Sequence, residues 1–176
     1  MQLGGQTVSF RHGHRTAVRR FCIGPHVRNQ EQEMSELDNK ALVRRYYDEV
    51  LNQGQLSVLD QIAAHDYMEH DPLPGQGNGR DDLRARVEML RAAFKPQFSI
   101  EDIVAEGDRV VIRWMSEGTH VGEFMGIPPA GARYRIAGID VHAVRGGRMA
   151  EHWHVVDQLS QLQQLGVIPR PDPANA

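Results

Sequence analysis

The sequence predicts an α+β fold in which three N-terminal helices cover one face of a curved antiparallel sheet. Two observations lead to this prediction. Before Pro96, apolar residues recur at helical spacing, and after Pro96 they alternate with polar residues as they do in strands. The chain has 176 residues, which is the usual size of one domain with at most a short tail.

Three helices are predicted in the first half of the chain. The first extends from Ser35 or Asp38, either of which can cap a helix N-terminus, to Gln53. A shorter helix is predicted over Leu56–Ile62, and a third over Arg80–Phe94, where apolar positions share one face and charged positions the other. Proline and glycine residues between the second and third helices are typical of turns.

Four strands are predicted in the second half: Ile100–Ala105, Arg109–Thr119, Tyr134–Val144 and Met149–Val156. The last two are joined by a tight turn containing Gly146 and Gly147, which is typical of a β-hairpin. We therefore expect an antiparallel sheet. A short last helix is predicted over Gln158–Leu165, and residues 171–176 are expected to form a loose tail.

The first 33 residues differ in charge from the rest of the chain. They contain five arginines and two glutamates, a net charge of +3, which leaves −6 for the other 143 residues because the total is −3. They show neither helical nor strand periodicity, so residues 1–33 are expected to be a disordered extension, with a targeting segment as the alternative. The domain is expected to span residues 34–170, and Met34 is expected to be the natural start of translation.

Composition limits the classes of function. Hydrophobic residues make up 40% and charged residues 24% of the chain, which excludes a wholly disordered or fibrous protein. A net charge of −3 argues against binding to nucleic acid or to an anionic membrane surface. Cys22 is the single cysteine, which excludes an internal disulfide and a thiolate zinc site. No apolar run is long enough to cross a membrane, so a soluble, cytoplasmic protein is expected.

Two residues are candidates for acid/base chemistry. On the second predicted strand, Trp114 and His120 are expected to face inward, because the alternate positions hold Arg113 and Glu117. Hydrophobicity does not settle the direction of the third strand, so Asp140 either faces inward or is solvated. A buried carboxylate costs several kcal/mol unless it has a partner, so an inward Asp140 needs a raised pKa or a nearby histidine. The alternative is a solvated Asp140 and a hydrogen-bonded His120 in a loop.

Metal and covalent chemistry are not expected. His152 and His154 share one face of a strand, but no cysteine or carboxylate stands at ligand spacing, so no metal is predicted. The chain has no G-x-S-x-G motif and only Cys22 as a thiol, so no covalent nucleophile is predicted. The direction of the last strand stays open: either His152 and His154 or Trp153 and Asp157 face the pocket. Trp153 could also be a core aromatic, and Asp157 the cap of the last helix.

Three stretches of the sequence point to a known family. They are Gly118–Gly131, Gly138–Val141 and Gly147–Trp153, and they resemble the SnoaL-like polyketide cyclases, also called ester cyclases, of the nuclear transport factor 2-like superfamily. The resemblance extends over Asn39–Pro169. It implies a cone-shaped α+β barrel, in which a bent sheet wraps the helices around a deep apolar pocket. It also implies a homodimer formed through the sheet.

The resemblance implies roles for individual residues. In characterised cyclases of this family, an aspartate on a late strand, helped by a histidine, moves protons during an intramolecular aldol closure without metal or cofactor. Asp140 stands at the position of that aspartate, and His120 is implied as its partner. Tyr47, Asp71 and Asp140 also resemble, more distantly, positions in ketosteroid isomerase. The expected substrate-binding residues are Tyr47, His70, Asp71, Trp114, Phe124 and Trp153.

The expected function is that of a cofactor-independent proton-transfer enzyme acting on a small apolar carbonyl compound. We expect the apolar pocket to raise the pKa of Asp140 towards neutrality, so that one carboxylate removes and returns a proton. The alternatives are a non-catalytic small-molecule binding protein and a dimeric scaffold with an unused pocket. An epoxide hydrolase is not expected, because Arg113, Asp140 and Asp157 do not share a consistent face.

Overall fold

The computed structural model describes residues 6–8, 19–21 and 25–170 of the chain, which forms two compact units, Met1–Ser35 and Glu36–Ala176. In the first unit, β1 (Gln6–Val8) and β2 (Arg19–Phe21) form an antiparallel pair that the sequence pattern did not predict. The expected disorder of residues 1–33 falls largely on positions outside the described residues, and the expected loose tail at 171–176 falls wholly outside them.

The first long helix begins earlier than predicted. Helix α1 spans Pro25–Arg45 and continues as the π-helix η1 (Tyr46–Asn52), so the predicted start at Ser35 or Asp38 is wrong. Proline suits the first helical position because the backbone nitrogen there needs no helical partner. Residues 28–33 are all polar, so this part of the sequence carries no apolar stripe that would reveal the first turns.

The other helices match their predictions. The 3-10 helix η2 (Leu56–Val58) and α2 (Leu59–Ile62) together form the predicted second helix, and α3 spans Arg80–Phe94. Helix α3 ends where Lys95 adopts a left-handed conformation, with φ of 47°, directly before a proline. The last helix, α4, spans Gln158–Gln164.

The four predicted strands are confirmed, and a fifth strand joins them. Strands β4 (Gln97–Glu106), β5 (Arg109–Thr119), β6 (Arg133–Arg145) and β7 (Arg148–Val156) pair antiparallel in sequence order. The fifth, β3 (Ala63–Glu69), pairs parallel with β7, so the sheet is mixed and not purely antiparallel. An irregular register between Ala63 and Met68 interrupts the alternation of apolar and polar residues, which explains why β3 was missed.

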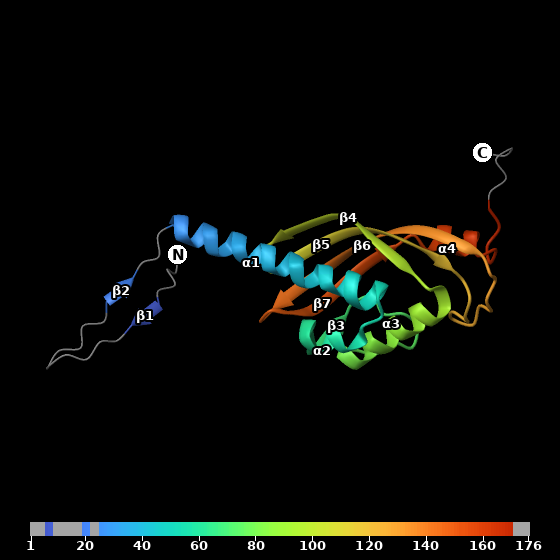
Figure 1. Cartoon of the computed structure of the whole chain (residues 1–176), viewed down its shortest axis with the longest axis horizontal. Helices are drawn as coiled ribbons and strands as arrows, with labels where there is room; N and C mark the ends of the chain where they lie inside the picture. The colour runs from blue at the N-terminus through green and yellow to red at the C-terminus, as the bar shows by residue number, and fades with distance from the viewer. Residues whose placement is uncertain (1–5, 9–18, 22–24, 171–176) are drawn as a thin grey trace. The chain divides into compact units, whose positions relative to one another are not determined.

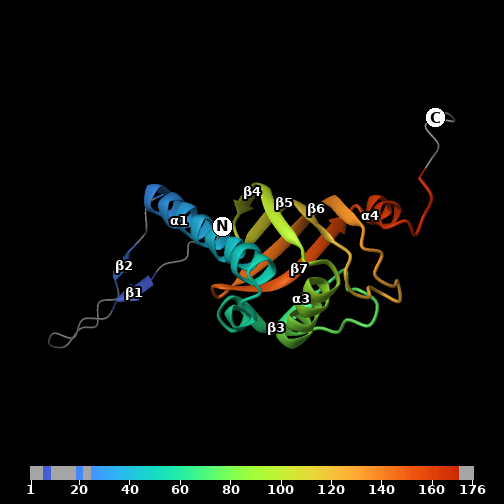
Figure 2. The same cartoon turned by 45° about the vertical axis from the view of Figure 1, so that its right-hand side comes forward.

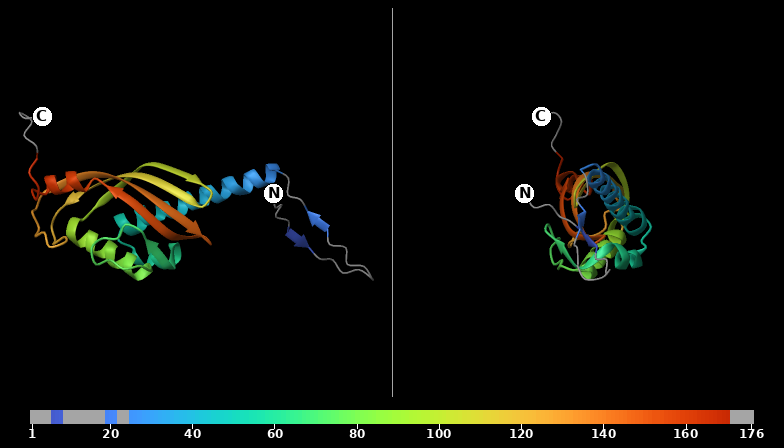
Figure 3. Two further views of the ribbon diagram at one scale, coloured as in Figure 1. Left: turned by 180° about the vertical axis from the view of Figure 1, so that it is seen from behind. Right: turned by 90° about the vertical axis from the view of Figure 1, so that its left-hand side faces the viewer.

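The sheet curves over the helical layer, which confirms the predicted α+β class with a curved sheet. In Figures 1 and 3, strands β4–β7 arch over α2 and α3. Strand β3 lies against α3 at the edge of the sheet (Figure 2), and α4 packs against β6. The space between the layers is filled by fully buried side chains, among them Tyr47, Ile62, Val87, Ile112 and Met149. Among the described residues, no helix is both long and apolar enough to span a membrane.

Candidate active site

A cavity of about 90 Å³ lies on the inner face of the sheet. The inward side chains of β6 run from Tyr134 and Ile136 to Asp140, so one end of the cavity is apolar and the other carries titratable groups. Tyr134 and Asp140 are six residues apart, which corresponds to roughly 20 Å along a strand. The apolar end is lined by Phe94, Phe98, Trp114, Phe124, Tyr134 and Ile136.

Gly138 makes room for an aromatic wall close to Asp140. It is paired with Trp114 in the register of β5 and β6. A Cβ atom at position 138 would lie only 2.1 Å from Cζ2 of the Trp114 indole, a distance that side-chain atoms do not adopt. The glycine therefore allows the indole ring to pack against the backbone of β6, where it lines the cavity.

Asp140 faces inward and is only 6% exposed, which settles the direction that hydrophobicity left open. Its Oδ2 atom accepts a hydrogen bond from the hydroxyl of Tyr47 and lies 3.4 Å from Nε2 of His152. Burial acts to raise the pKa of Asp140, but the positive charge of the nearby His152 ring, followed by His142 and the hydrogen bond from Tyr47, brings it below its usual range. The expectation of a raised pKa is therefore wrong, and the carboxylate is ionised at neutral pH.

A second buried carboxylate, Glu69, lies behind His152. Glu69 comes from the end of β3, and its Oε2 atom lies 2.8 Å from Nδ1 of His152 and 2.5 Å from Nη1 of Arg86 on α3. Burial opposes the charge of Glu69, but the hydrogen bond with His152 and the nearby His154 ring hold the pKa of Glu69 below its usual range. Burial likewise acts to lower the pKa of His152, whereas its contacts with Asp140 and Glu69 raise it. Opposite charges thus alternate from Arg86 to Asp140.

Three histidine rings are stacked beside these carboxylates. The ring centroids of His142 and His152 are 4.6 Å apart, and those of His152 and His154 are 5.1 Å apart. Burial, reinforced by the charge of His152, lowers the pKa of His142 to about 3, so this ring is neutral at physiological pH. Nδ1 of His154 lies 3.4 Å from Oε1 of Glu69, and the His154 side chain lines the cavity.

The same side chains include two sets with metal-ligand geometry. Three ligand atoms lie within 4.8 Å of one another in the set Glu69, His152 and His154, and likewise in the set Asp140, His142 and His152. In the first set the guanidinium of Arg86 already contacts the carboxylate, and it would repel a second cation. In the second set Tyr47 and His152 contact the carboxylate. We therefore interpret both sets as hydrogen-bonded networks; the absence of a bound metal stays a prediction.

His120 is fully buried, but it is not the partner of Asp140. The register pairs Asp140 with Ile112, and His120 lies eight residues further along, which is roughly 26 Å on an extended chain. His120 stacks on Phe94, and its Nδ1 atom accepts a hydrogen bond from the backbone N–H of Ala130. The expected pairing with Asp140 is therefore corrected: the histidine that contacts Asp140 is His152.

Three of the expected ligand contacts lie away from the cavity. Trp153 points to the outer face of the sheet, opposite to its neighbours on β7, and stacks on His70 at a centroid distance of 4.1 Å. The carboxylate of Asp71 accepts a hydrogen bond from the backbone N–H of His154 and is exposed. His70, Asp71 and Trp153 do not line the cavity, so their expected ligand contacts are corrected.

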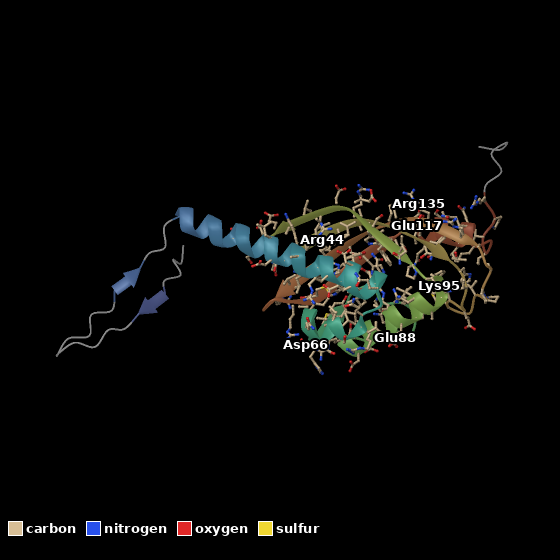
Figure 4. All side chains as sticks on the ribbon, viewed as in Figure 1. Arg44, Asp66, Glu88, Lys95, Glu117 and Arg135 are labelled. Carbon is tan, nitrogen blue, oxygen red and sulfur yellow. The ribbon has the colours of Figure 1, made fainter. Side chains whose placement is uncertain are left out.

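The outer face also carries charged pairs. Glu117 and Arg135, which are paired across β5 and β6 and labelled in Figure 4, are both exposed.

The direction of the last strand, which the sequence left open, is settled because His152 and His154 face the cavity. Asp157 caps α4 by accepting a hydrogen bond from the backbone N–H of Ser160, as one of the two interpretations predicted.

The remaining expected residues are at the cavity, and others were missed. Trp114 and Phe124 line it, and Tyr47 lies behind Asp140 as a hydrogen-bond donor. Burial and the charge of Asp140 raise the pKa of Tyr47, so its hydroxyl stays protonated. Glu69 and Arg86 were not predicted, because β3 itself was not predicted and Arg86 lies among the charged residues of α3.

The family follows from comparison with known sequences. A family model for SnoaL-like polyketide cyclases matches residues 41–165. The chain belongs to this family. Among members of the SnoaL-like family, the aklanonic acid methyl ester cyclase of Streptomyces sp. (strain C5) is 31% identical over 141 residues, which cover 75% of this chain and 83% of that enzyme. The resemblance that the sequence motifs carry is confirmed.

Comparisons with a second enzyme and with a solved structure agree with this family assignment. The nogalonic acid methyl ester cyclase of Streptomyces nogalater is 30% identical over 126 residues, which cover 69% of this chain and 92% of that enzyme. The structure of TsrD from Streptomyces laurentii is similar with a TM-score of 0.69 and 28% identity, over 75% of this chain and 97% of that one. The similarity therefore covers nearly the whole length of both relatives.

Proposed function

We propose that this SnoaL-like protein is a cofactor-independent cyclase that closes a ring by intramolecular aldol chemistry on a small, apolar polyketide-like carbonyl compound. The observation that carries the proposal is an ionised Asp140 at the polar end of an apolar cavity, in contact with Tyr47 and His152. The similarity to the aklanonic and nogalonic acid methyl ester cyclases supports an ester of a polyketide-like compound as the substrate.

Each step of the proposed reaction uses groups at that end of the cavity. Asp140 takes a proton from the carbon next to a substrate carbonyl, and the resulting enolate carbon forms a bond to a second carbonyl carbon of the same molecule. The oxygen of that second carbonyl takes a proton from His152. General acid and base groups of this kind contribute roughly 10²–10⁴-fold to the rate. The product is an isomer of the substrate, so no co-reactant is needed.

The cavity must widen to admit such a substrate. Its volume of about 90 Å³ is below the ~300–1,000 Å³ that ligand pockets usually have. Phe124 lies on the connection between β5 and β6 and covers the apolar end, where it packs against Phe94 at a centroid distance of 4.7 Å. Movement of this connection would open the apolar end and leave the network around Asp140 in place.

The test of this function is exchange and ring closure in the wild-type protein. A panel of aromatic β-keto methyl esters is incubated with the protein in D2O and followed by NMR. We expect deuterium to enter at the α-carbon and a cyclised isomer to form from at least one of these esters. Tight binding of the esters without exchange would replace this proposal with the alternative, a non-catalytic binding protein.

We also propose that the protein acts in the cytoplasm as a homodimer formed through the outer face of the sheet. Three apolar side chains on this face are strongly exposed: Val104 at 58%, Ile139 at 48% and Val155 at 75%. Ile139 and Val155 are paired in the register of β6 and β7, and adjacent exposed apolar side chains are typical of an interface. Sedimentation should give a dimer at micromolar concentration, and Val155→Lys should shift it to a monomer. A wild-type monomer would contradict the proposal.

A further inference from the structure

Glu69 is a buried carboxylate that the proposed reaction does not use. Its side chain is 0% exposed, and it does not line the cavity. Burial of a carboxylate costs several kcal/mol unless charged and hydrogen-bonding partners compensate. Its partners are Arg86 on one side and His152 on the other, so the burial cost of Glu69 is offset in part by a residue of the proposed site.

The geometry determines which nitrogen of His152 carries a permanent proton. Nδ1 lies 2.8 Å from Oε2 of Glu69, and an ionised carboxylate only accepts hydrogen bonds, so Nδ1 is protonated. Nε2 lies 3.4 Å from Oδ2 of Asp140 and is therefore left to bind the proton that can move. Without Glu69, either nitrogen could carry the proton of a neutral ring.

We propose that Glu69 is a positioning residue, which holds His152 by Nδ1 so that one mobile proton is shared between Nε2 of His152 and the carboxylate of Asp140. This inference rests on the proposed function. Glu69 itself neither gains nor loses a proton, because the guanidinium of Arg86, 2.5 Å away, favours its ionised form.

The proton balance of the reaction closes over these groups. The substrate carbon gives its proton to Asp140, and the newly formed alkoxide takes the proton from Nε2 of His152. His152 is then neutral with its proton on Nδ1, held by Glu69. Asp140 finally returns its proton to Nε2, which restores the starting state. Without the fixed Nδ1–H, the neutral ring could keep its proton on Nε2 and block this last transfer.

The charged groups around His152 favour its protonated form. Facing it are Glu69 from β3, Asp140 and His142 from β6, and His154 from β7, with Arg86 of α3 beyond Glu69 and Tyr47 of η1 bonded to Asp140. Burial acts to lower the pKa of His152, but the nearby carboxylates of Asp140 and Glu69 raise it above its ordinary value. Removal of the Glu69 charge should therefore lower it.

The test is ¹⁵N NMR of the histidine rings across a pH titration, in the wild type and in Glu69→Gln. In the wild type we expect Nδ1 of His152 to stay protonated throughout. In Glu69→Gln, which has the same shape without the charge, we expect the titration midpoint of His152 to fall by at least about 1 pH unit. The control is Glu151→Gln, which lies on the outer face of β7 with His70 and Arg145, and which should leave the midpoint unchanged.

Two outcomes would overturn the inference. One is a neutral His152 in the wild type with its proton on Nε2, a result that does not depend on whether Glu69→Gln folds. The other is an unchanged midpoint of His152 in a folded Glu69→Gln. Neither measurement uses a substrate, so failure of this inference can be distinguished from failure of the proposed function. The proposed function fails when the wild-type protein exchanges no α-protons.

Discussion

His152 and Asp140 lie on neighbouring strands, with Nε2 of His152 3.4 Å from Oδ2 of Asp140. The register pairs Asp140 with His154, so the contact with His152 is a diagonal one across β6 and β7. Both side chains are buried, and both line the apolar cavity. A carboxylate next to an imidazolium stays ionised in surroundings that would otherwise favour its neutral form. The pair therefore presents a proton acceptor and a proton donor side by side.

Asp140→Asn should abolish most of the turnover and leave the fold intact. Asparagine has nearly the same shape but cannot take a proton from carbon, so we expect kcat to fall by roughly 10²–10⁴-fold. The rate of ring closure measures the effect, and circular dichroism checks the fold. Asp102→Asn is the matched control, because Asp102 is exposed on β4 and forms a surface ion pair with Arg113. Turnover within about 3-fold of wild type would show that Asp140 is not the base.

Tyr47→Phe should move the acidic limb of the pH–rate profile to higher pH. The Tyr47 hydroxyl is one of the groups that lower the pKa of Asp140. Without this donor the pKa rises, and the carboxylate is protonated and inactive at a higher pH than in the wild type. A charge-assisted hydrogen bond of ~1.4 kcal/mol corresponds to a shift of about one unit in the limb of kcat/KM. A limb that stays in place or moves to lower pH would contradict the assignment.

Gly138→Ala should destabilise the protein through its contact with Trp114. The new methyl group would overlap the indole ring, and overpacking of this kind costs about 1–3 kcal/mol. Urea unfolding measures the loss. Trp114→Leu introduced into the Gly138→Ala protein should recover part of it, because the smaller side chain leaves room for the methyl group. Unchanged stability in the single variant would mean that Trp114 does not pack against position 138.

The free energy of unfolding should decrease as the pH falls below about 6.5, the ordinary pKa of histidine. The main reason is His142, whose pKa is lowered to about 3 by burial and by the charge of His152. Between these values the unfolded chain takes up a proton at this residue and the folded chain does not, so acid favours unfolding. Urea unfolding at about pH 6.5 and about pH 5.5, which lies above the pKa of ordinary carboxylates, measures the slope.

The matched variants for this slope are His142→Asn and His65→Asn. The first removes the buried group and should flatten the dependence, whereas the second changes an exposed histidine and should retain it. Should His142→Asn keep the wild-type slope, another group would be responsible for the acid sensitivity.

Much of the fold could be predicted from local sequence patterns. The strands β4–β7 alternate with period two and α3 has an apolar face, and these local periods were enough to place the predicted strands and helices where the structure has them. The family motifs predicted the same fold, and the model of that family matches residues 41–165. Both helix α1 and strand β3 lack such a period: residues 28–33 of α1 are all polar, and the irregular register of β3 interrupts its alternation.

Residue patterns and motifs were enough to predict the fold class, the family, and Asp140 as the candidate base. The groups that surround this base follow from the folded chain. Glu69, Arg86 and His152 come from β3, α3 and β7, and their contacts depend on a parallel strand pairing and on the diagonal register of β6 and β7. Distances between residues far apart in the chain are set by how the sheet bends and pairs, and no local pattern encodes them. For that reason His120, near in the sequence motif, lies far from Asp140, and His152 lies beside it.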